Sequence, residues 1–242
     1  MANFYINKED IQENIATIKG EEAQHISRVL RMKKGDALTL CDGEGMFYDA
    51  TLTDFSDKTV TAKISASYTA PTEPDVQLTV FQGVPKNPKL ETIVKKLTEI
   101  GAVRIVPMDT KRAVAKLDKS AKVERLRKIA QEAAKQSKRG IVPEVLDAVP
   151  FKKAVEMASE ADLALIPYEE ETEVSIKKAL SGKTPKTVSV MIGPEGGFEK
   201  EEVLLAKDAG IQSVTLGKRI LRTETAPLTV ASVALYELGE ME

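Results

Sequence analysis

The chain has 242 residues, of which 42% are hydrophobic, and this length and composition suit one large domain or two small ones. No apolar run approaches the roughly 18 residues of a membrane-spanning helix, and the N-terminus lacks the basic-then-apolar pattern of a secretory signal. We therefore expect a cytoplasmic protein with no membrane partner. The single cysteine, Cys41, excludes an intramolecular disulfide, and with the single histidine, His25, it cannot form a zinc site. We expect structural roles for both residues and no bound metal.

The formal net charge of −2 conceals an uneven distribution of charge. Residues 1–70 carry 8 basic and 11 acidic side chains, a net charge of −3, whereas residues 111–139 carry 11 basic and 3 acidic side chains, a net charge of +8. Such a basic block is typical of a protein that binds a polyanion, although a solvated helix face has the same composition. A second basic cluster favours nucleic acid as the partner; it consists of Lys86, Lys89, Lys95 and Lys96.

Residues 1–70 have the pattern of a small β domain. Residues 21–32 have the spacing of a short amphipathic helix, whose expected inner face consists of Ala23, Ile26, Val29 and Leu30. Three segments separated by turns show the two-residue period of antiparallel strands; they are residues 37–42, 46–55 and 59–68. Closure of these strands into a compact barrel would leave no open sheet edge. The polar, Pro-rich residues 69–74 are the expected linker.

From residue 76 onward, strands and helices alternate. The expected strands are residues 76–82, 103–108, 142–146, 161–167 and 187–192, with a short strand around Val214. The expected helices are residues 88–100, 119–138, 151–159, 173–180 and 199–209, with a last helix after Ala226. This alternation predicts a parallel sheet covered by helices on both faces. The fold class is therefore α/β, with one domain at residues 1–70 and a second at residues 75–242.

The second half is organised around a glycine-rich loop, Gly-Pro-Glu-Gly-Gly-Phe at residues 193–198. Glycine lets the backbone approach a ligand closely, and open α/β sheets bind ligands at the ends of their strands. The spacing matches neither a P-loop nor a dinucleotide fingerprint. A second polar loop, about 25 residues later, carries Arg219, Arg222 and Glu224 before the last helix. The two loops would flank one crevice if the strands that precede them are neighbours.

Motifs along nearly the whole chain resemble one enzyme family. The first part contains His-Ile-Ser-Arg-Val-Leu-Arg at residues 25–31, and the middle contains Lys-Leu-Thr-Glu-Ile-Gly at 96–101. Near the end come the glycine-rich loop and Leu-Arg-Thr-Glu-Thr-Ala at residues 221–226. In this order and spacing, the chain resembles the RsmE-type 16S rRNA (uracil-N3)-methyltransferases of the SPOUT class, which use S-adenosylmethionine.

The resemblance implies a PUA-like RNA-binding β-barrel at residues 1–70 and a SPOUT methyltransferase domain at residues 75–242, the end of which forms a trefoil knot. It also implies a homodimer that uses S-adenosyl-L-methionine. The substrate would be 16S rRNA within the small ribosomal subunit, methylated on uridine N3 near the decoding centre. One departure concerns residues 110–113, Thr-Lys-Arg-Ala, where the family often has Ser-Glu-Arg-Ser; the arginine is kept and the glutamate is not.

The resemblance also assigns candidate residues to the site. The expected catalytic residues are Arg222, as an electrophilic or orienting group, and Glu195 or Glu224 as the base that takes the N3 proton. The alternative for Glu224 is helix capping beside Thr223 or Thr225, and for Arg222 a salt bridge to Glu224 or Glu195. The expected cofactor-binding residues are Pro167, Ile192, Gly193, Pro194, Glu195, Gly196, Gly197, Leu216, Gly217, Ile220, Leu221, Arg222 and Thr225.

Several cations and one amide are the expected RNA contacts. They are Arg28, Arg31, Lys86, Lys89, Lys111, Arg112, Gln136 and Arg139. For Arg28 and Arg31 the alternative is a plain surface helix, with Arg31 bridging to an acid such as Asp36. Two other functions stay open: a SPOUT methyltransferase that acts on another RNA such as tRNA, and an RNA-binding protein that has lost catalysis. The first motif argues against tRNA, and the intact loops argue against lost catalysis.

Overall fold

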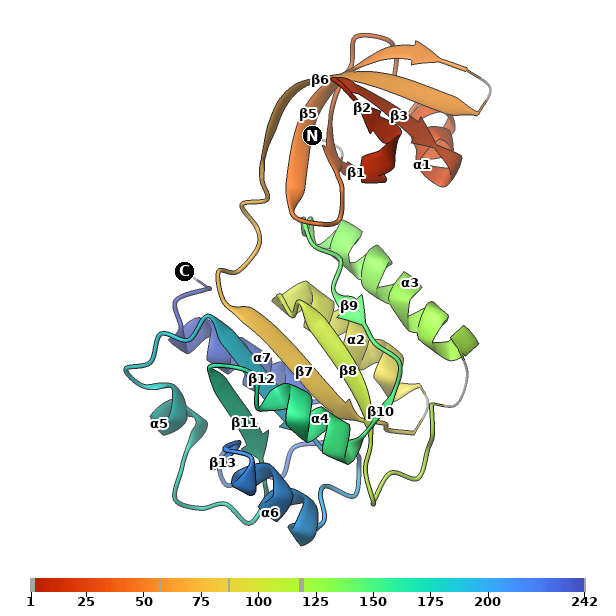
Figure 1. Ribbon diagram of the computed structural model, residues 1–242. Coiled ribbons are helices and arrows are strands. Elements are labelled where there is room, and N and C mark those ends of the chain that lie inside the picture. Colours follow the sequence, from red (N-terminus) through yellow and green to blue (C-terminus); the bar gives the residue numbers. More distant parts are fainter. Residues whose placement is uncertain (1–2, 57, 87, 118–119, 242) are drawn as a thin grey trace. The chain divides into compact units, whose positions relative to one another are not determined.

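The computed structural model describes residues 3–56, 58–86, 88–117 and 120–241 (Figure 1). Its contacts divide the chain into two compact units. The first unit consists of Met1–Glu73 and Ala134–Val142, and the second of Pro74–Ala133 and Pro143–Glu242. The stretch Ala134–Val142 thus joins the first unit although it lies inside the range expected for the α/β half.

The first unit is built on a six-stranded sheet with the order β1-β4-β5-β6-β3-β2. The strands are β1 (Asn3–Tyr5), β2 (Ile11–Gln12), β3 (Ile15–Lys19), β4 (Ala37–Cys41), β5 (Met46–Phe55) and β6 (Thr59–Thr69). The β1–β4 pair is parallel and the other pairs are antiparallel. Strands β4, β5 and β6 match the predicted segments. Strands β1, β2 and β3 were not predicted. No pairing joins the end strands β1 and β2 within the described residues, so the expected barrel closure is not present there.

The predicted helix at residues 21–32 is replaced by α1 (Gly20–Gln24) and a π-helical turn, η2 (His25–Val29). The Leu30 N–H donates to His25 O at 2.9 Å, five residues back. One extra residue per turn rotates the following side chains by about 100°. Ala23 and Ile26 are buried as expected, but Val29 is 68% and Leu30 45% exposed. The expected inner face is therefore wrong for the last two residues.

Cys41 and His25 have structural surroundings. The Cys41 thiol is buried and donates to Gly140 O at 3.4 Å, and burial raises its pKa to about 11. It is therefore protonated at neutral pH and a poor nucleophile. The His25 ring meets the Phe4 ring edge-on, with 5.8 Å between the ring centroids.

The second unit contains a seven-stranded sheet in which every described pair is parallel. The order is β10-β8-β7-β12-β11-β13, with β9 beside β8. The strands are β7 (Gln77–Gly83), β8 (Arg104–Asp109), β9 (Glu144–Val145), β10 (Val149–Pro150), β11 (Leu163–Pro167), β12 (Thr187–Ile192) and β13 (Gln212–Val214). The helices are α2 (Lys89–Ile100), α3 (Ser120–Gln136), α4 (Phe151–Ala158), α5 (Ile176–Leu180), α6 (Lys200–Asp208) and α7 (Ala226–Glu237). The predicted α/β class is confirmed, and the strand that was not predicted is β10.

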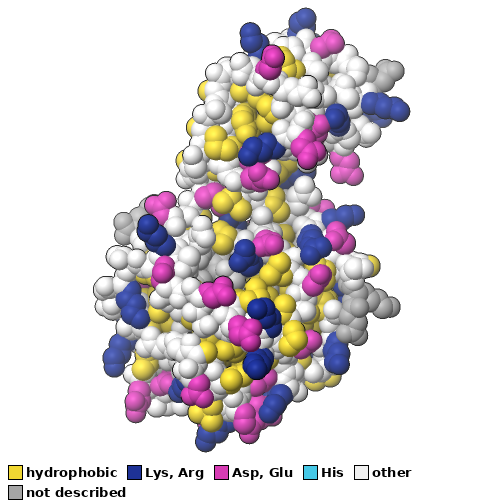
Figure 2. All heavy atoms as spheres, viewed as in Figure 1, with side chains coloured by type: hydrophobic (Ala, Val, Ile, Leu, Met, Phe, Trp, Pro, Cys, Tyr) yellow, Lys and Arg dark blue, Asp and Glu magenta, His cyan; other side chains and the backbone are white. Residues whose placement is uncertain are grey.

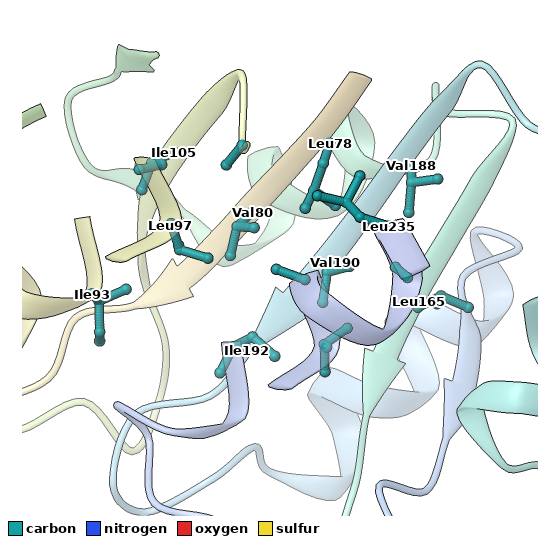
Figure 3. Packing of buried hydrophobic residues seen from close by; sticks show 14 of the residues in the cluster. Leu78, Val80, Ile93, Leu97, Ile105, Leu165, Val188, Val190, Ile192 and Leu235 are labelled. Carbon is teal, nitrogen blue, oxygen red and sulfur yellow. The ribbon is translucent and has the colours of Figure 1, made fainter. Parts of the chain in front are cut away.

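Helices cover both faces of this sheet (Figure 1). On one face, α2, α3, α5 and α7 pack against the sheet, and Figure 3 shows part of this core around Val80, Leu97 and Leu235. On the other face, α4 and α6 pack against Phe81, Met191 and neighbouring residues. Adjacent residues of β7 and β12 therefore point into different cores, in agreement with the predicted sheet covered on both faces. The central strands β7 and β12 end where the glycine-rich loop begins.

Carboxylates neutralise part of the basic block on α3. Arg125 pairs with Glu91 at 2.9 Å, and Arg127 pairs with Glu124. On the face shown in Figure 2, basic and acidic side chains are interspersed. Within the described residues, no helix combines the length and the apolar character that a membrane crossing requires.

Candidate active site

The glycine-rich loop, residues 193–198, leaves the carboxyl end of β12 as a tight turn. The Gly197 N–H donates to Pro194 O at 3.0 Å, and Gly197 has a φ of +68°, which residues with a Cβ rarely adopt. At Gly193, an added Cβ would lie 3.0 Å from the backbone of Gly197. Glycine is therefore needed at both positions for the loop to fold back on itself.

The buried amide of Gln82 ties this loop to the second polar loop. Gln82 lies beside Ile192 in the parallel register of β7 and β12. Its Nε2 donates to Gly193 O at 3.3 Å and to Thr223 Oγ1 at 3.2 Å. The Thr223 hydroxyl in turn donates to Gly193 O at 2.8 Å. Because Gln82 is 0% exposed, these hydrogen bonds form in a low-dielectric interior, where they are stronger than in water.

The two loops meet even though the strands that precede them are not neighbours. β11 lies between β12 and β13 and pairs with both of them. The sequence predicted that the two loops flank one crevice if the strands before them are neighbours, and these strands are not neighbours. Contact arises instead because the segment after β13 returns to the end of β12, where Thr223 reaches Gly193, and α7 then packs on the sheet.

A three-residue ion cluster lies at the same edge of the sheet. The Lys89 ammonium is 3.2 Å from Glu195 Oε1 and 3.1 Å from Glu224 Oε2. Glu195 also accepts a hydrogen bond from the Lys86 backbone N–H at 3.1 Å. Both candidate bases therefore share one cation. Lys89, which the sequence suggested as an RNA contact, lies between them.

Both carboxylates are held in the ionised form. Burial acts to raise the pKa of Glu195, but hydrogen bonds from its own backbone N–H, from Lys89 and from Lys86 outweigh burial, and its pKa is lowered. The pKa of Glu224 is lowered first by its own backbone N–H and then by Lys89, with a contribution from the charge of Arg222. Hydrogen bonds to Glu224 and Glu195 raise the pKa of Lys89. Each carboxylate can accept a proton at neutral pH, but its low pKa makes it a weak base.

The segment after β8 braces the glycine-rich loop from another side. Arg112 Nη1 donates to Gly196 O at 2.9 Å, and its Nε donates to Glu199 Oε1 at 2.9 Å. Glu199 caps the start of α6 through a reciprocal capping box. Lys111 pairs with Glu201 at 3.0 Å. The sequence predicted that Lys111 and Arg112 contact RNA. In the structure they form ion pairs with Glu201 and Glu199 of the same chain.

Arg222 is exposed and adjoins the ion cluster. Its carbonyl oxygen accepts hydrogen bonds from Thr225 at 2.8 Å and Ala226 at 2.9 Å, which start α7. Across the described parts of the chain, its guanidinium has neither the salt bridge to Glu195 nor the one to Glu224 that the sequence left open. Thr225 occupies the N-cap position of α7, but its side chain makes no capping hydrogen bond. Arg222 is therefore available to an incoming group.

The other cofactor candidates lie near three strand ends. Ile192 is buried at the end of β12, and Pro167 ends β11 beside Val214 of β13. Leu216 is half-buried and packs against the core, and Gly217 has a φ of +100°. The remaining two follow Gly217 in the second loop: Leu221 is half-buried and Ile220 is 89% exposed.

The RNA candidates fall into different environments. Arg28 and Arg31 are exposed on the first unit, and Arg31 has a φ of +53°, in the left-handed region. No bridge joins Arg31 to Asp36 in the described structure, where Asp36 instead accepts the Lys33 backbone N–H at 2.7 Å. Lys86 and Gln136 are also exposed.

Arg139 is a correction to the sequence-based prediction. Its side chain is 4% exposed, and its Nη2 lies 2.6 Å from Glu73 Oε2. Glu73 also accepts hydrogen bonds from the backbone N–H groups of Gly140 and Ile141. Arg139 therefore anchors the 134–142 stretch inside the first unit rather than offering a charge to a phosphate.

Sequence reasoning missed Gln82 and Thr223 as residues that organise the site. Gln82 directly follows the apolar pair Val80-Phe81 at the end of β7, and a polar residue there is a detectable signal for a buried hydrogen bond. Thr223 had no comparable signal because its partner, Gly193, is 30 residues away. Among the described residues, no group of three or more His, Cys, Asp or Glu side chains is arranged to hold a metal ion.

Two family models match the chain. An RNA methyltransferase domain matches residues 72–235, and an RNA methyltransferase PUA domain matches residues 18–65. The ribosomal RNA small subunit methyltransferase E of Bacillus subtilis is 37% identical over 98% of this chain and 97% of its own length. The chain belongs to the ribosomal RNA small subunit methyltransferase E family. The Synechocystis member is 34% identical and covers 96% of this chain and 76% of its own length.

Solved structures similar to this chain share its fold. The Neisseria gonorrhoeae ribosomal RNA small subunit methyltransferase E, bound to S-adenosyl methionine, is 30% identical with a TM-score of 0.84. It covers 98% of this chain and 97% of its own. A putative methyltransferase from Legionella pneumophila, also in complex with this cofactor, is 29% identical with a TM-score of 0.81 and covers 97% and 96% of the two chains. This family member therefore consists of a PUA-like first unit and an α/β second unit.

Proposed function

We propose that this chain uses S-adenosyl-L-methionine to methylate N3 of a uridine in 16S rRNA of the small ribosomal subunit, near the decoding centre. The observation that carries the proposal is the 37% identity, over 98% of the chain, to a ribosomal RNA small subunit methyltransferase. The two polar loops are complete and joined through Gln82. An intact loop pair supports an active enzyme rather than an RNA-binding protein without catalysis.

The residues at the strand ends suit S-adenosylmethionine. The cofactor carries a sulfonium and an ammonium cation, and the ionised Glu195 and Glu224 supply a negative potential beside the glycine-rich loop. Supporting contacts for its adenine and methionine parts come from the remaining candidates: Pro167, Ile192, Gly193, Pro194, Gly196, Gly197, Leu216, Gly217, Ile220, Leu221, Arg222 and Thr225. When bound, the cofactor supplies an electrophilic methyl group.

The chain's own residues prepare the uracil. Uracil N3 is protonated at neutral pH, so a base must take the proton before N3 acts as a nucleophile. Glu195 or Glu224 takes it, since both are ionised in the resting site. Arg222, exposed and without a salt bridge to either carboxylate, stabilises the negative charge that spreads over the uracil. Because N3 lies on the pairing edge, the uridine enters unpaired or flipped.

Residues 1–70 present RNA to a methyltransferase domain at residues 75–242. The matches to an RNA methyltransferase PUA domain and an RNA methyltransferase domain support this division. Arg28, in the π-helical turn where Val29 is also exposed, and Arg31, two residues after that turn, contact phosphates. Gln136 and Lys86, both exposed, are further candidate RNA contacts. Replacement of Arg28 and Arg31 by Ser would lower the slope of log affinity against log salt by one to two units, because each lost phosphate contact removes about one.

The working enzyme is a cytoplasmic homodimer whose C-terminal end forms a trefoil knot. The return of the chain after β13 to Gly193 supports the knot, and a crystal structure traced through residues 193–226 would test it. The 89% exposure of the apolar Ile220 supports its coverage by a second copy. Light scattering should give twice the mass of a single chain; the mass of one chain would contradict the homodimer.

Methyl transfer from labelled S-adenosylmethionine tests the function. The acceptors are unmethylated small ribosomal subunits, naked 16S rRNA and bulk tRNA, and the modified nucleoside is identified by mass spectrometry. We expect N3-methyluridine mainly in the subunits. Label in tRNA would overturn the substrate, and cofactor binding without label in any acceptor would overturn the enzymatic activity.

A further inference from the structure

We propose that Lys89 is a positioning residue that joins Glu195 to Glu224 and keeps both carboxylates free of protons. The inference rests on the proposed function, because the two carboxylates are its candidate bases. Lys89 makes 3.2 Å and 3.1 Å ion pairs to them. These three residues come from three segments: the start of α2, the glycine-rich loop and the residues before α7.

The position of Lys89 on its helix favours a functional role. Lys89 is the first residue of α2, where the backbone N–H groups and the helix dipole are unfavourable for a cation. No side-chain cap is present at this helix start. Residues that are unfavourable for local stability tend to occur at functional sites. The two carboxylates offset this local disadvantage and fix the ammonium between the loops.

The core holds the backbone of Lys89 in place. Leu90 and Ile93, in the first two turns of α2, are buried in the core against the sheet. The Lys86 backbone N–H donates to Glu195 from just before the same helix. The side chains of Lys89, Glu195 and Glu224 are each 28–34% exposed. The cluster therefore has a fixed frame and still faces solvent, from which a substrate arrives.

Removal of the Lys89 charge would leave two carboxylates that had shared one cation. Like charges disfavour joint ionisation, so one carboxyl group would take up a proton at a higher pH. Arg222 is the other charged side chain that lowers the pKa of Glu224, and Lys86 contributes its backbone N–H to Glu195. With Lys89 absent, Arg222 alone cannot offset both charges.

An ionised carboxylate is what the methyl transfer requires. The N3–H proton passes to the carboxylate, and the N3 electron pair forms the new bond to the methyl carbon. The electron pair of the broken carbon–sulfur bond stays on sulfur, giving S-adenosylhomocysteine. A carboxyl group that already holds a proton cannot take the one from N3. Lys89 thus determines the pH range in which the site works.

The direct test is a carboxyl titration of the free protein. The protein is labelled with 13C at the glutamate side-chain carboxyl, and the two signals are assigned with Glu195→Gln and Glu224→Gln. In Lys89→Met, at least one signal should titrate about one pH unit or more above its wild-type midpoint. Lys89→Arg, which keeps the charge, should retain low midpoints, and Lys152→Met, an exposed lysine of α4, should match the wild type. Unchanged midpoints in Lys89→Met would overturn the proposal.

The kinetic test follows kcat against pH, with cofactor affinity and thermal unfolding measured alongside. The acid limb of the Lys89→Met profile should move to higher pH, and for a midpoint shift of about one unit the loss in kcat should approach about tenfold at pH values below both midpoints. A merely structural role would lower activity equally at every pH, and that result would contradict the proposal. If the wild type makes no N3-methyluridine, the proposed function fails, but the carboxyl titration still decides the role of Lys89.

Discussion

Two arginines that the sequence linked to RNA, one in each unit, pair with glutamates in different surroundings. Arg139 of the first unit and its partner Glu73 are 4% and 9% exposed. Arg112 of the second unit and its partner Glu199 are 40% and 37% exposed. Removing one partner of a buried pair leaves an uncompensated charge in the interior, whereas an exposed pair exchanges its partner for water at little cost. The two arginines therefore differ in burial, although both are paired with a glutamate.

The largest expected effect comes from breaking the buried pair. Arg139→Met should destabilise the first unit by about 3–5 kcal/mol, because Glu73 would stay buried without its cation. Urea unfolding followed by circular dichroism measures the change. Arg104→Met, which breaks an exposed pair with Glu144, is the matched control and should cost at most about 1 kcal/mol. An equal loss of unfolding free energy in the two variants would show that burial does not distinguish these arginine–glutamate pairs.

Arg222 adds a third case to this comparison, because within the described residues it has no salt bridge to Glu195 or Glu224. Arg222→Ala should fold and dimerise normally but lose methyl transfer by about a hundredfold, as expected when a charge-stabilising donor is removed. Single-turnover transfer to small ribosomal subunits measures the loss. Arg104→Ala should keep near-normal activity. Near-normal turnover of Arg222→Ala would take Arg222 out of the mechanism.

The brace between Arg112 and the glycine-rich loop can be tested through Gly196. An added Cβ at Gly196 would lie 3.0 Å from Arg112 Cβ, so Gly196→Val must push the loop or the brace aside. Cofactor affinity should fall by about tenfold or more, which corresponds to roughly 1.4 kcal/mol. Calorimetric titration with S-adenosylmethionine measures the affinity, and unchanged binding would show that the loop backbone does not approach the cofactor.

The smallest expected effect is the pH dependence of the exposed ion cluster. Glu195 and Glu224 have lowered pKa values in the folded protein. Their contribution to stability is therefore complete above the unfolded pKa, about 4.3, and is lost as the pH falls through the folded values. The difference in unfolding free energy between the wild type and Glu195→Gln/Glu224→Gln should be small, level above about pH 5, and shrink below pH 4. A difference that grows on acidification would contradict this assignment.

The sequence alone determined the parts of this protein that depend on local patterns. Apolar runs between turns predicted β7 and β12 to within a residue, and three glycines in five positions predicted the tight loop at 193–198. The motifs indicated the enzyme family because they keep their order along the chain. Periodicity failed at Val29 and Leu30, where one extra residue in a π-helical turn rotates both side chains into solvent.

Only the tertiary structure decided which distant residues share the site. Lys89, Glu195 and Glu224 are separated by more than a hundred residues at the widest, and their meeting depends on the order of strands in the sheet and on the return of the chain to β12. The sequence alone did not determine burial either. Arg139 and Arg222 are the same residue type, but Arg139 is buried inside a unit and Arg222 faces solvent. Charge pattern is a local property of the chain, but desolvation depends on what else packs around a side chain.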